Sequence, residues 1–123
     1  MVDAAPRAEA GSDAPEVGVV GAVTPELMLG LSANGIAAFV VTDAEPVDAA
    51  TRALYAPGAS EAEVRALAEA GPPVLTDADR GDLGRLTAML AAGAADVVLR
   101  PVSAAELARK LLRAARDAEP ARR

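Results

Sequence analysis

The stretch that decides the fold is GAADVVLRPVSAAEL, residues 93–107. Gly93 follows apolar residues at helical spacing, and glycine is the residue type that most often ends a helix. Residues 96–99, DVVL, are typical of a short buried strand. An Arg-Pro step follows, and Ser103 with Glu106 has the spacing of a capping box, which begins a helix. The stretch therefore predicts a helix, a strand and a second helix in succession.

The same alternation extends toward the amino terminus. Strands are predicted at 17–20, 36–41, 73–76 and 96–99, and helices are predicted to begin at Thr24, Ser60, Asp82 and Ser103. Residues 46–50 suggest a short helix, and 52–56 suggest either a strand or the end of that helix. Strands that alternate with amphipathic helices indicate a parallel sheet covered on both faces. We therefore predict an α/β fold with a doubly wound parallel five-stranded sheet, and the alternative of one reduced strand or helix stays open.

Two helices of this pattern have predicted inward faces. In the helix from Asp82 we expect Leu83, Leu86, Met89 and Leu90 to face the core, and in the last helix Leu107, Leu111 and Leu112. One domain over 16–118 accommodates all of these elements. Residues 1–15 are rich in Ala, Asp, Pro and Gly without an apolar period, so we expect a disordered tail there, and 119–123 should be frayed.

The composition excludes several classes of chemistry. The chain has no cysteine and no histidine, so it has no disulfide, no thiolate, and neither the usual general base nor the commonest metal ligand. No apolar run approaches the roughly 18 residues of a membrane span, and the start lacks a signal-peptide pattern. We expect a cytoplasmic protein that binds no membrane. The abundance of Ala and Arg is typical of bacteria with GC-rich genomes.

The charge is unevenly distributed along the chain. The net charge is −6, which argues against binding to nucleic acid. Residues 1–99 hold 15 acidic and 5 basic residues, whereas residues 100–123 hold 3 acidic and 7 basic ones. The last predicted helix carries four of these bases: Arg109, Lys110, Arg113 and Arg116. They form either a solvated helix face or a docking surface for an acidic partner.

The carboxyl-terminal half resembles the receiver domains of two-component response regulators. In GAADVVLRP, residues 93–101, the matches to the family's GADDYLTKP-like stretch are Gly93, Ala94, Asp96, Leu99 and Pro101. PPVLTDA, residues 72–78, resembles the family's fourth strand, with Thr76 at the hydroxyl position. The resemblance covers residues 57–116, and 17–56 fit in outline. It implies a flavodoxin-like, CheY-like fold, in which the peptide before Pro101 is often cis.

The receiver reaction needs an acceptor aspartate, an acid pair that holds Mg²⁺, a hydroxyl and a lysine. By the resemblance, the acid pair falls on Gly21 and Ala22, and the acceptor on Ala53, or on Tyr55 or Ala56 in a shifted register. The lysine falls on Arg100, and Thr76 alone is kept. The degenerate phosphorylation pocket therefore comprises Gly21, Ala22, Ala53, Thr76, Arg100 and Pro101. We predict a pseudo-receiver that keeps the fold, has no cofactor and is not an enzyme.

Three alternatives remain open at this point. Asp43 ends an apolar run and could be the acceptor of an atypical active receiver. Asp43, Asp77 and Asp79 could hold a metal ion at the carboxyl edge of the sheet, which could also bind a small ligand. Arg100 could instead pair with Asp43 or Asp77 and hold the pocket in one state.

The resemblance also implies a partner surface. In receivers the output surface is made by helix 4, strand 5 and helix 5, which fall on about residues 82–116 here. With its basic side at Arg109, Lys110, Arg113 and Arg116, this surface suits a protein partner or a homodimer. We therefore expect a signalling or scaffold module that acts through protein contacts.

Overall fold

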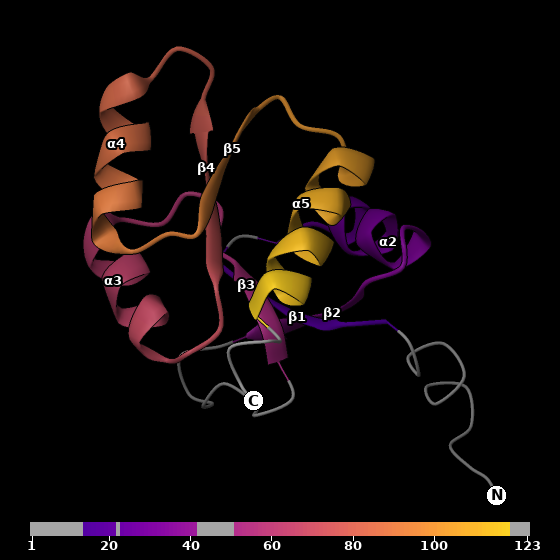
Figure 1. The fold of residues 1–123 in the computed structure, drawn as a ribbon. Helices are drawn as coiled ribbons and strands as arrows, with labels where there is room; N and C mark the ends of the chain where they lie inside the picture. The colour runs from indigo at the N-terminus through magenta and orange to yellow at the C-terminus, as the bar shows by residue number, and fades with distance from the viewer. Residues whose placement is uncertain (1–13, 22, 42–50, 119–123) are drawn as a thin grey trace, which may run out of the picture.

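The computed structural model describes residues 14–21, 23–41 and 51–118, and Figure 1 shows their fold. Several predictions concern residues outside these ranges: most of the disordered tail, Ala22, Asp43, the short helix at 46–50 and the frayed end at 119–123.

Five parallel strands form one sheet in the order β2-β1-β3-β4-β5. The strands are β1 Glu16–Val20, β2 Ala37–Val41, β3 Thr51–Tyr55, β4 Val74–Asp79 and β5 Asp96–Arg100. The predicted fold class is confirmed. The stretch that was ambiguous between strand and helix end is β3, so the helical interpretation of it is wrong.

Four helices are described: α2 Pro25–Ala33, α3 Glu61–Glu69, α4 Leu83–Ala92 and α5 Ala104–Ala118. The predicted caps are present where local chemistry specifies them. The Leu27 N–H donates to Oγ1 of Thr24 at 3.1 Å, and Ser60 forms a full capping box with Glu63. Gly93 ends α4 with a φ of 118°, in the left-handed region that favours glycine.

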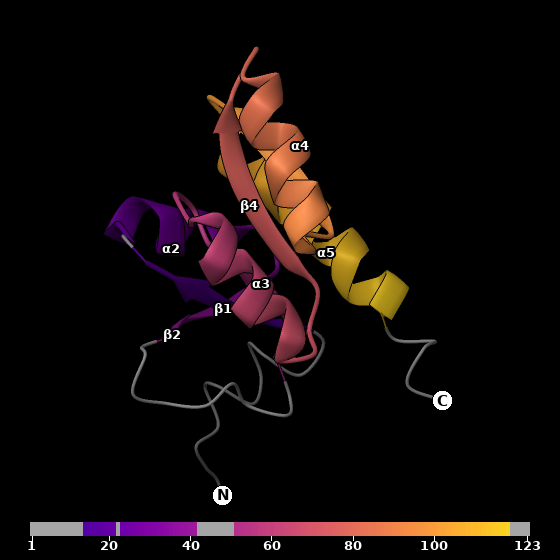
Figure 2. The same ribbon diagram turned by 90° about the vertical axis from the view of Figure 1, so that its left-hand side faces the viewer.

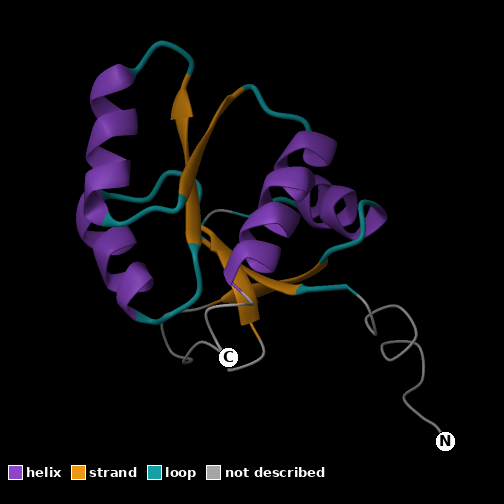
Figure 3. Ribbon diagram, viewed as in Figure 1, coloured by secondary structure: helices purple, strands orange, loops and turns teal. Residues whose placement is uncertain are grey.

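The helices cover the sheet in two layers. α2 and α5 lie on one side of the sheet, and α3 and α4 lie on the other (Figures 1 and 2). The core is accordingly divided. Val17, Val19, Tyr55, Leu75, Val98 and Leu111 are among the buried residues on the α2 and α5 side, and Leu54, Val64, Val74, Ala78, Met89 and Val97 on the α3 and α4 side. Figure 3 shows the strands alternating with helices, except that no described helix lies between β2 and β3.

The predicted inward face of α4 is only half right. Met89 is buried and Leu86 is half-buried, but Leu83 and Leu90 are 69% and 47% exposed. Leu83 and Leu90 are seven residues apart and so share one side of the helix, rotated by about 80° from the mean direction of Leu86 and Met89. In α5, by contrast, Leu107 and Leu111 are buried as predicted, and Leu112 is half-buried.

A close approach between α2 and α5 depends on a glycine. A Cβ placed on Gly30 would lie 2.6 Å from the Cβ of Ala104, at the start of α5. The absence of a side chain at Gly30 therefore lets the two helices pack closely, and this contact sets the position of the β5–α5 connection at the carboxyl edge of the sheet.

We expect Gly30→Ala to lower the free energy of unfolding by about 1–3 kcal/mol, because the added methyl group must push two backbones apart. Gly84→Ala in α4 is the matched control. The nearest atom there lies 3.8 Å from the added Cβ, so the helix propensity of alanine should stabilise the protein by up to about 1 kcal/mol. Urea unfolding measures both, and equal stabilisation by the two substitutions would contradict the packing argument.

Candidate functional site

The ends of β3, β4 and β5 bring a cluster of polar side chains to the carboxyl edge of the sheet. Asp79 is the register partner of Arg100 on the neighbouring strand. Arg100 donates from Nε to Oδ1 of Asp79 at 2.9 Å and from Nη1 to Oδ2 of Asp77 at 3.1 Å. One guanidinium therefore bridges two carboxylates, and its pKa is raised, mainly by the hydrogen bond to Asp79.

Asp77 is the buried member of this cluster, with 4% of its surface exposed. Its Oδ1 accepts a hydrogen bond from the backbone N–H of Gly58 at 2.8 Å, in the loop after β3. The same oxygen lies 3.7 Å from Nη2 of Arg85. A buried carboxylate requires partners of this kind, because without them its charge would be strongly destabilising.

Arg85 reaches the cluster from α4, and the sequence did not reveal it. Its Nε donates to the backbone carbonyl of Asp77 at 2.6 Å, and its Nη2 donates to Oγ1 of Thr76 at 3.3 Å. The sequence indicates the position of Arg85 only through Asp82, the predicted helix cap three residues earlier. The Asp82 side chain accepts a hydrogen bond from the Arg85 N–H at 3.0 Å. That cap directs the first turn of α4 toward the end of β4.

Thr76 lies apart from the pocket to which the resemblance assigned it. It is fully buried, and its hydroxyl donates to the carbonyl of Ala56 at 2.7 Å. Successive side chains of a strand point to opposite faces, so Thr76 faces α3 and α4 with Val74 and Ala78, whereas Asp77 faces the other side with Leu75. Thr76 does not line the cleft with Asp77 and Arg100, but Nη2 of Arg85 lies 3.3 Å from its Oγ1 and 3.7 Å from Oδ1 of Asp77, so Thr76 and Asp77 share a cation.

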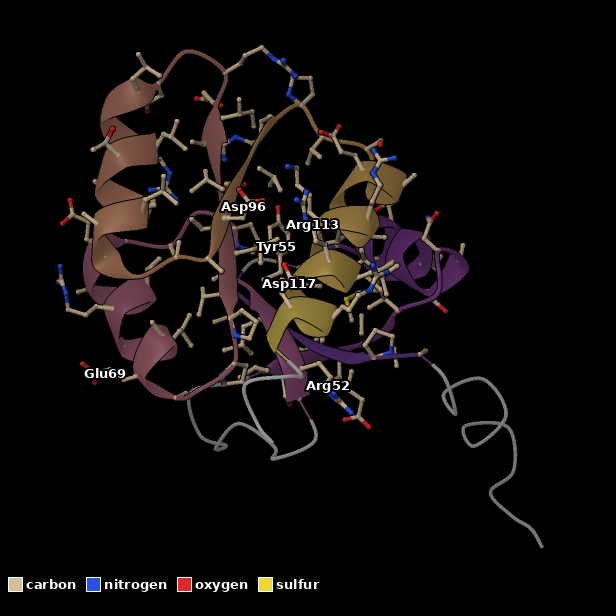
Figure 4. All side chains as sticks on the ribbon, viewed as in Figure 1. Arg52, Tyr55, Glu69, Asp96, Arg113 and Asp117 are labelled. Carbon is tan, nitrogen blue, oxygen red and sulfur yellow. The ribbon has the colours of Figure 1, made fainter. Side chains whose placement is uncertain are left out.

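The end of β3 is occupied by Tyr55. Ala53, the position first assigned to the acceptor, is fully buried in the core, two residues before the edge. Tyr55, the acceptor position in the shifted register, lines one cleft with Asp77 and Arg100, and Figure 4 labels it. Burial raises the pKa of its hydroxyl to about 12, and the charge of Asp77 adds to this while Arg100 opposes it.

The remaining pocket residues frame this edge. Gly21 follows β1 with a φ of 100° and offers no side-chain ligand. The Arg100–Pro101 peptide is cis, as the resemblance implied. A cleft of about 560 Å³ opens here, lined by Leu27, Tyr55, Asp77, Asp79, Arg100, Pro101, Val102, Ser103, Ala104 and Leu107.

The metal alternative finds little support in the described residues. Within 14–21, 23–41 and 51–118, no three acidic side chains gather closely enough to hold an ion. Asp77 and Asp79 both pair with Arg100, which places a cation where the ion would lie. Asp43, the third member of that set and the alternative acceptor, is outside the described ranges.

The basic residues of α5 do not act as one group. Arg109, Arg113 and Arg116 are exposed, and Figure 4 labels Arg113 with its neighbour Asp117. Lys110 is half-buried, and its Nζ lies 3.6 Å from Oδ2 of Asp96 at the start of β5. This pair ties α5 to the edge strand, so three of the four predicted bases face solvent.

The helices α4 and α5 flank β5 on the two sides of the sheet (Figure 1). We use the name α4–β5–α5 face for β5 together with the exposed residues Leu83, Leu90, Arg109, Arg113 and Arg116. The face includes two large exposed apolar side chains on α4 and three exposed arginines on α5. None of the described helices is both long and apolar enough to cross a membrane.

The sequence itself matches no protein-family model and no curated protein. Solved structures of the same fold are nevertheless found. NtrX from Brucella abortus superposes with a TM-score of 0.72 at 21% identity over 89% of this chain, which spans 28% of that one. A response regulator receiver domain protein from Clostridium thermocellum gives a TM-score of 0.69 at 13% identity, covering 85% of this chain and 97% of that one.

A third solved structure is a CheY-like protein, TadZ, from Pseudomonas aeruginosa. Its TM-score is 0.59 at 21% identity, and the match covers 81% of this chain and 93% of that protein. The fold is therefore that of response-regulator receiver domains, as the stretch around Arg100 and Pro101 predicted. The level of identity carries this conclusion for the fold alone.

We expect Arg100→Ala to lower the free energy of unfolding by about 1–3 kcal/mol, because buried Asp77 loses its nearest cation. Arg80→Ala is the control, since Arg80 is exposed in the next loop and makes no ion pair with the described residues. That variant should change stability by less than about 0.5 kcal/mol. Equal effects of the two substitutions in urea unfolding would show that the bridge to Asp77 contributes no stability.

Proposed function

We propose that the protein is a receiver-like signalling or scaffold module that is not phosphorylated and acts by binding another protein. The observation that carries the proposal is the position of Asp77. Its buried carboxylate already accepts the Gly58 N–H and the Arg100 guanidinium. By the resemblance, Arg100 stands where receivers use a lysine to hold the phosphoryl group. Here the Asp77 carboxylate of the same chain binds the Arg100 guanidinium instead.

The groups needed for phosphoryl transfer are also replaced. The end of β3 carries Tyr55, whose hydroxyl, like that of any tyrosine, is protonated at neutral pH, and burial raises its pKa further, to about 12. A neutral phenol is a much weaker nucleophile than a carboxylate with an adjacent metal ion. Gly21 follows β1 without a side chain to hold Mg²⁺. The described ends of β1 and β3 thus supply neither a carboxylate nucleophile nor a metal ligand.

The same contacts join the pocket to α4. Arg85 donates to the Asp77 carbonyl at 2.6 Å and lies 3.7 Å from the Asp77 carboxylate. A permanent anion at Asp77 would therefore hold α4 in one position relative to β4 and β5. We infer a module with one fixed binding state, in which no phosphorylation event is needed to set the output surface.

The surface best suited to a partner is the α4–β5–α5 face. Leu83 and Leu90 are 69% and 47% exposed, and large exposed apolar side chains beside cations favour a protein interface with acidic surroundings. The net charge of −6 makes an extended nucleic-acid contact less favourable than an acidic protein.

We expect no phosphorylation when the protein is incubated with acetyl phosphate and Mg²⁺, and no change of amide chemical shifts with beryllofluoride and Mg²⁺. An active receiver domain treated in parallel serves as the positive control. Intact-mass and amide-shift measurements record the result. A stable phosphoaspartate, at Asp43 or elsewhere, would replace this proposal with the alternative of an atypical active receiver.

The binding half of the proposal has its own test. Proteins captured from the native host by the tagged full chain should be lost when Arg109 and Arg113 are both changed to glutamate. Arg65→Glu is the matched charge reversal, because Arg65 is exposed on α3, on the other side of the sheet. Quantitative mass spectrometry compares the three baits, and a partner retained by the double variant would place binding away from α5.

A further inference from the structure

The two edges of the sheet differ in how they are protected. β5, at one edge, begins with Asp96 and ends with Arg100, and Lys110 pairs with Asp96. β2, at the other edge, has the sequence AAFVV and carries no charged side chain. Natural proteins place charges on edge strands to prevent pairing with other chains. β2 lacks this protection, and Val40 is 50% exposed.

The backbone of β2 presents unused hydrogen-bonding groups. The Ala37 N–H donates to the carbonyl of Pro15 at 3.0 Å, on the side of β1. The backbone groups of successive residues in a strand point to opposite sides. The N–H and C=O of Phe39 therefore also point toward β1, whereas those of Ala38 and Val40 point outward. Among the described residues, β1 alone pairs with β2, and no other hydrogen bond to β2 is made.

We propose that β2 pairs antiparallel with β2 of a second copy of this chain. With Phe39 opposite the second copy's Phe39, Ala38 lies opposite Val40 in both directions. Both of these pairs present outward groups, so each exchanges two hydrogen bonds, or about four in total. Phe39 then forms the non-hydrogen-bonded pair at the two-fold axis.

Self-complementarity is the reason to assign this edge to a second copy. A two-fold axis through Phe39 satisfies every outward group of Ala38 and Val40 with the same residues, and no like charges face each other. The Phe39 ring leans over Gly18 of β1, where an added Cβ would lie 3.4 Å from it, so the proposed pairing depends on the backbone groups of β2.

The size of the contact limits its strength. One pair of five-residue strands buries less than the roughly 1,200 Å² of a stable specific interface. We therefore expect a dissociation constant on the order of hundreds of micromolar. β2 and β5 are at opposite edges of the sheet, so the dimer leaves both α4–β5–α5 faces open and would bind a multivalent partner more tightly than the monomer does.

The experiment measures sedimentation and amide hydrogen exchange of the full chain from about 10 µM to about 1 mM. The weight-average mass should rise toward that of a dimer. Exchange of the outward amides of Ala38 and Val40 should slow by about threefold over this range, whereas the Phe39 amide, bonded to β1, should be protected at every concentration.

Two substitutions at one position isolate the backbone contact. Val40→Pro removes an outward N–H without breaking a bond to β1, and should weaken dimerisation at least about tenfold. Val40→Thr keeps the N–H and the β-branched shape, and should leave dimerisation nearly unchanged. The exchange measurement uses the unmodified chain, so it decides the matter even where Val40→Pro does not fold.

Two results would overturn the proposal. A protein that is monomeric at the highest concentration, with outward amides that exchange independently of concentration, would exclude pairing through β2. A dimer that survives Val40→Pro but is lost with Arg113→Glu would place the contact on the α4–β5–α5 face. Neither result bears on whether the protein is phosphorylated, so this inference and the proposed function can fail separately.

Discussion

The ion pair between Arg100 and Asp77 is the contact on which the carboxyl edge of this domain depends. A carboxylate with 4% of its surface exposed is tolerated only when its oxygens have partners. Asp77 draws these partners from three places: β5 through Arg100, α4 through Arg85 and the β3–α3 loop through the Gly58 N–H. Three segments that are distant in sequence are thereby fixed around one side chain.

This constraint also explains why the basic residue is an arginine. Its Nη1 contacts Asp77 and its Nε contacts Asp79, at 3.1 and 2.9 Å, so two edges of one planar group serve two carboxylates. A lysine presents a single ammonium on a flexible stem and cannot offer two fixed donors at that spacing. The substitution of Arg100 for the family's lysine and the presence of Asp77 and Asp79 are therefore parts of one arrangement.

The sequence predicted those features that are encoded locally. Thr24, Ser60 and Gly93 act within one helical turn, so the helix boundaries followed from their spacing. The sequence predicted less reliably which face of the sheet each strand residue occupies, because a slip of one residue exchanges the two sides of a strand. The structure places the Thr76 hydroxyl on the carbonyl of Ala56, and it places Tyr55, two residues after Ala53 and on the same face, in the cleft with Arg100. The contacts of Arg85 depend on where α4 meets β4, which no local pattern specifies.

The two outer strands of the sheet, β5 and β2, differ in the charges that they carry. At the β4–β5 side, Arg100 and Asp77 form an ion pair at the carboxyl edge of the sheet. Lys110 of α5 and Asp96 form a second ion pair at the start of the outer strand, β5. β2 carries no charged side chain, and the alternation along the strand directs the backbone groups of Ala38 and Val40 outward. Of the two outer strands, β5 therefore carries charges that disfavour pairing with another chain, and β2 does not. The α4–β5–α5 face, at the β5 edge, then remains available for contact with a partner protein.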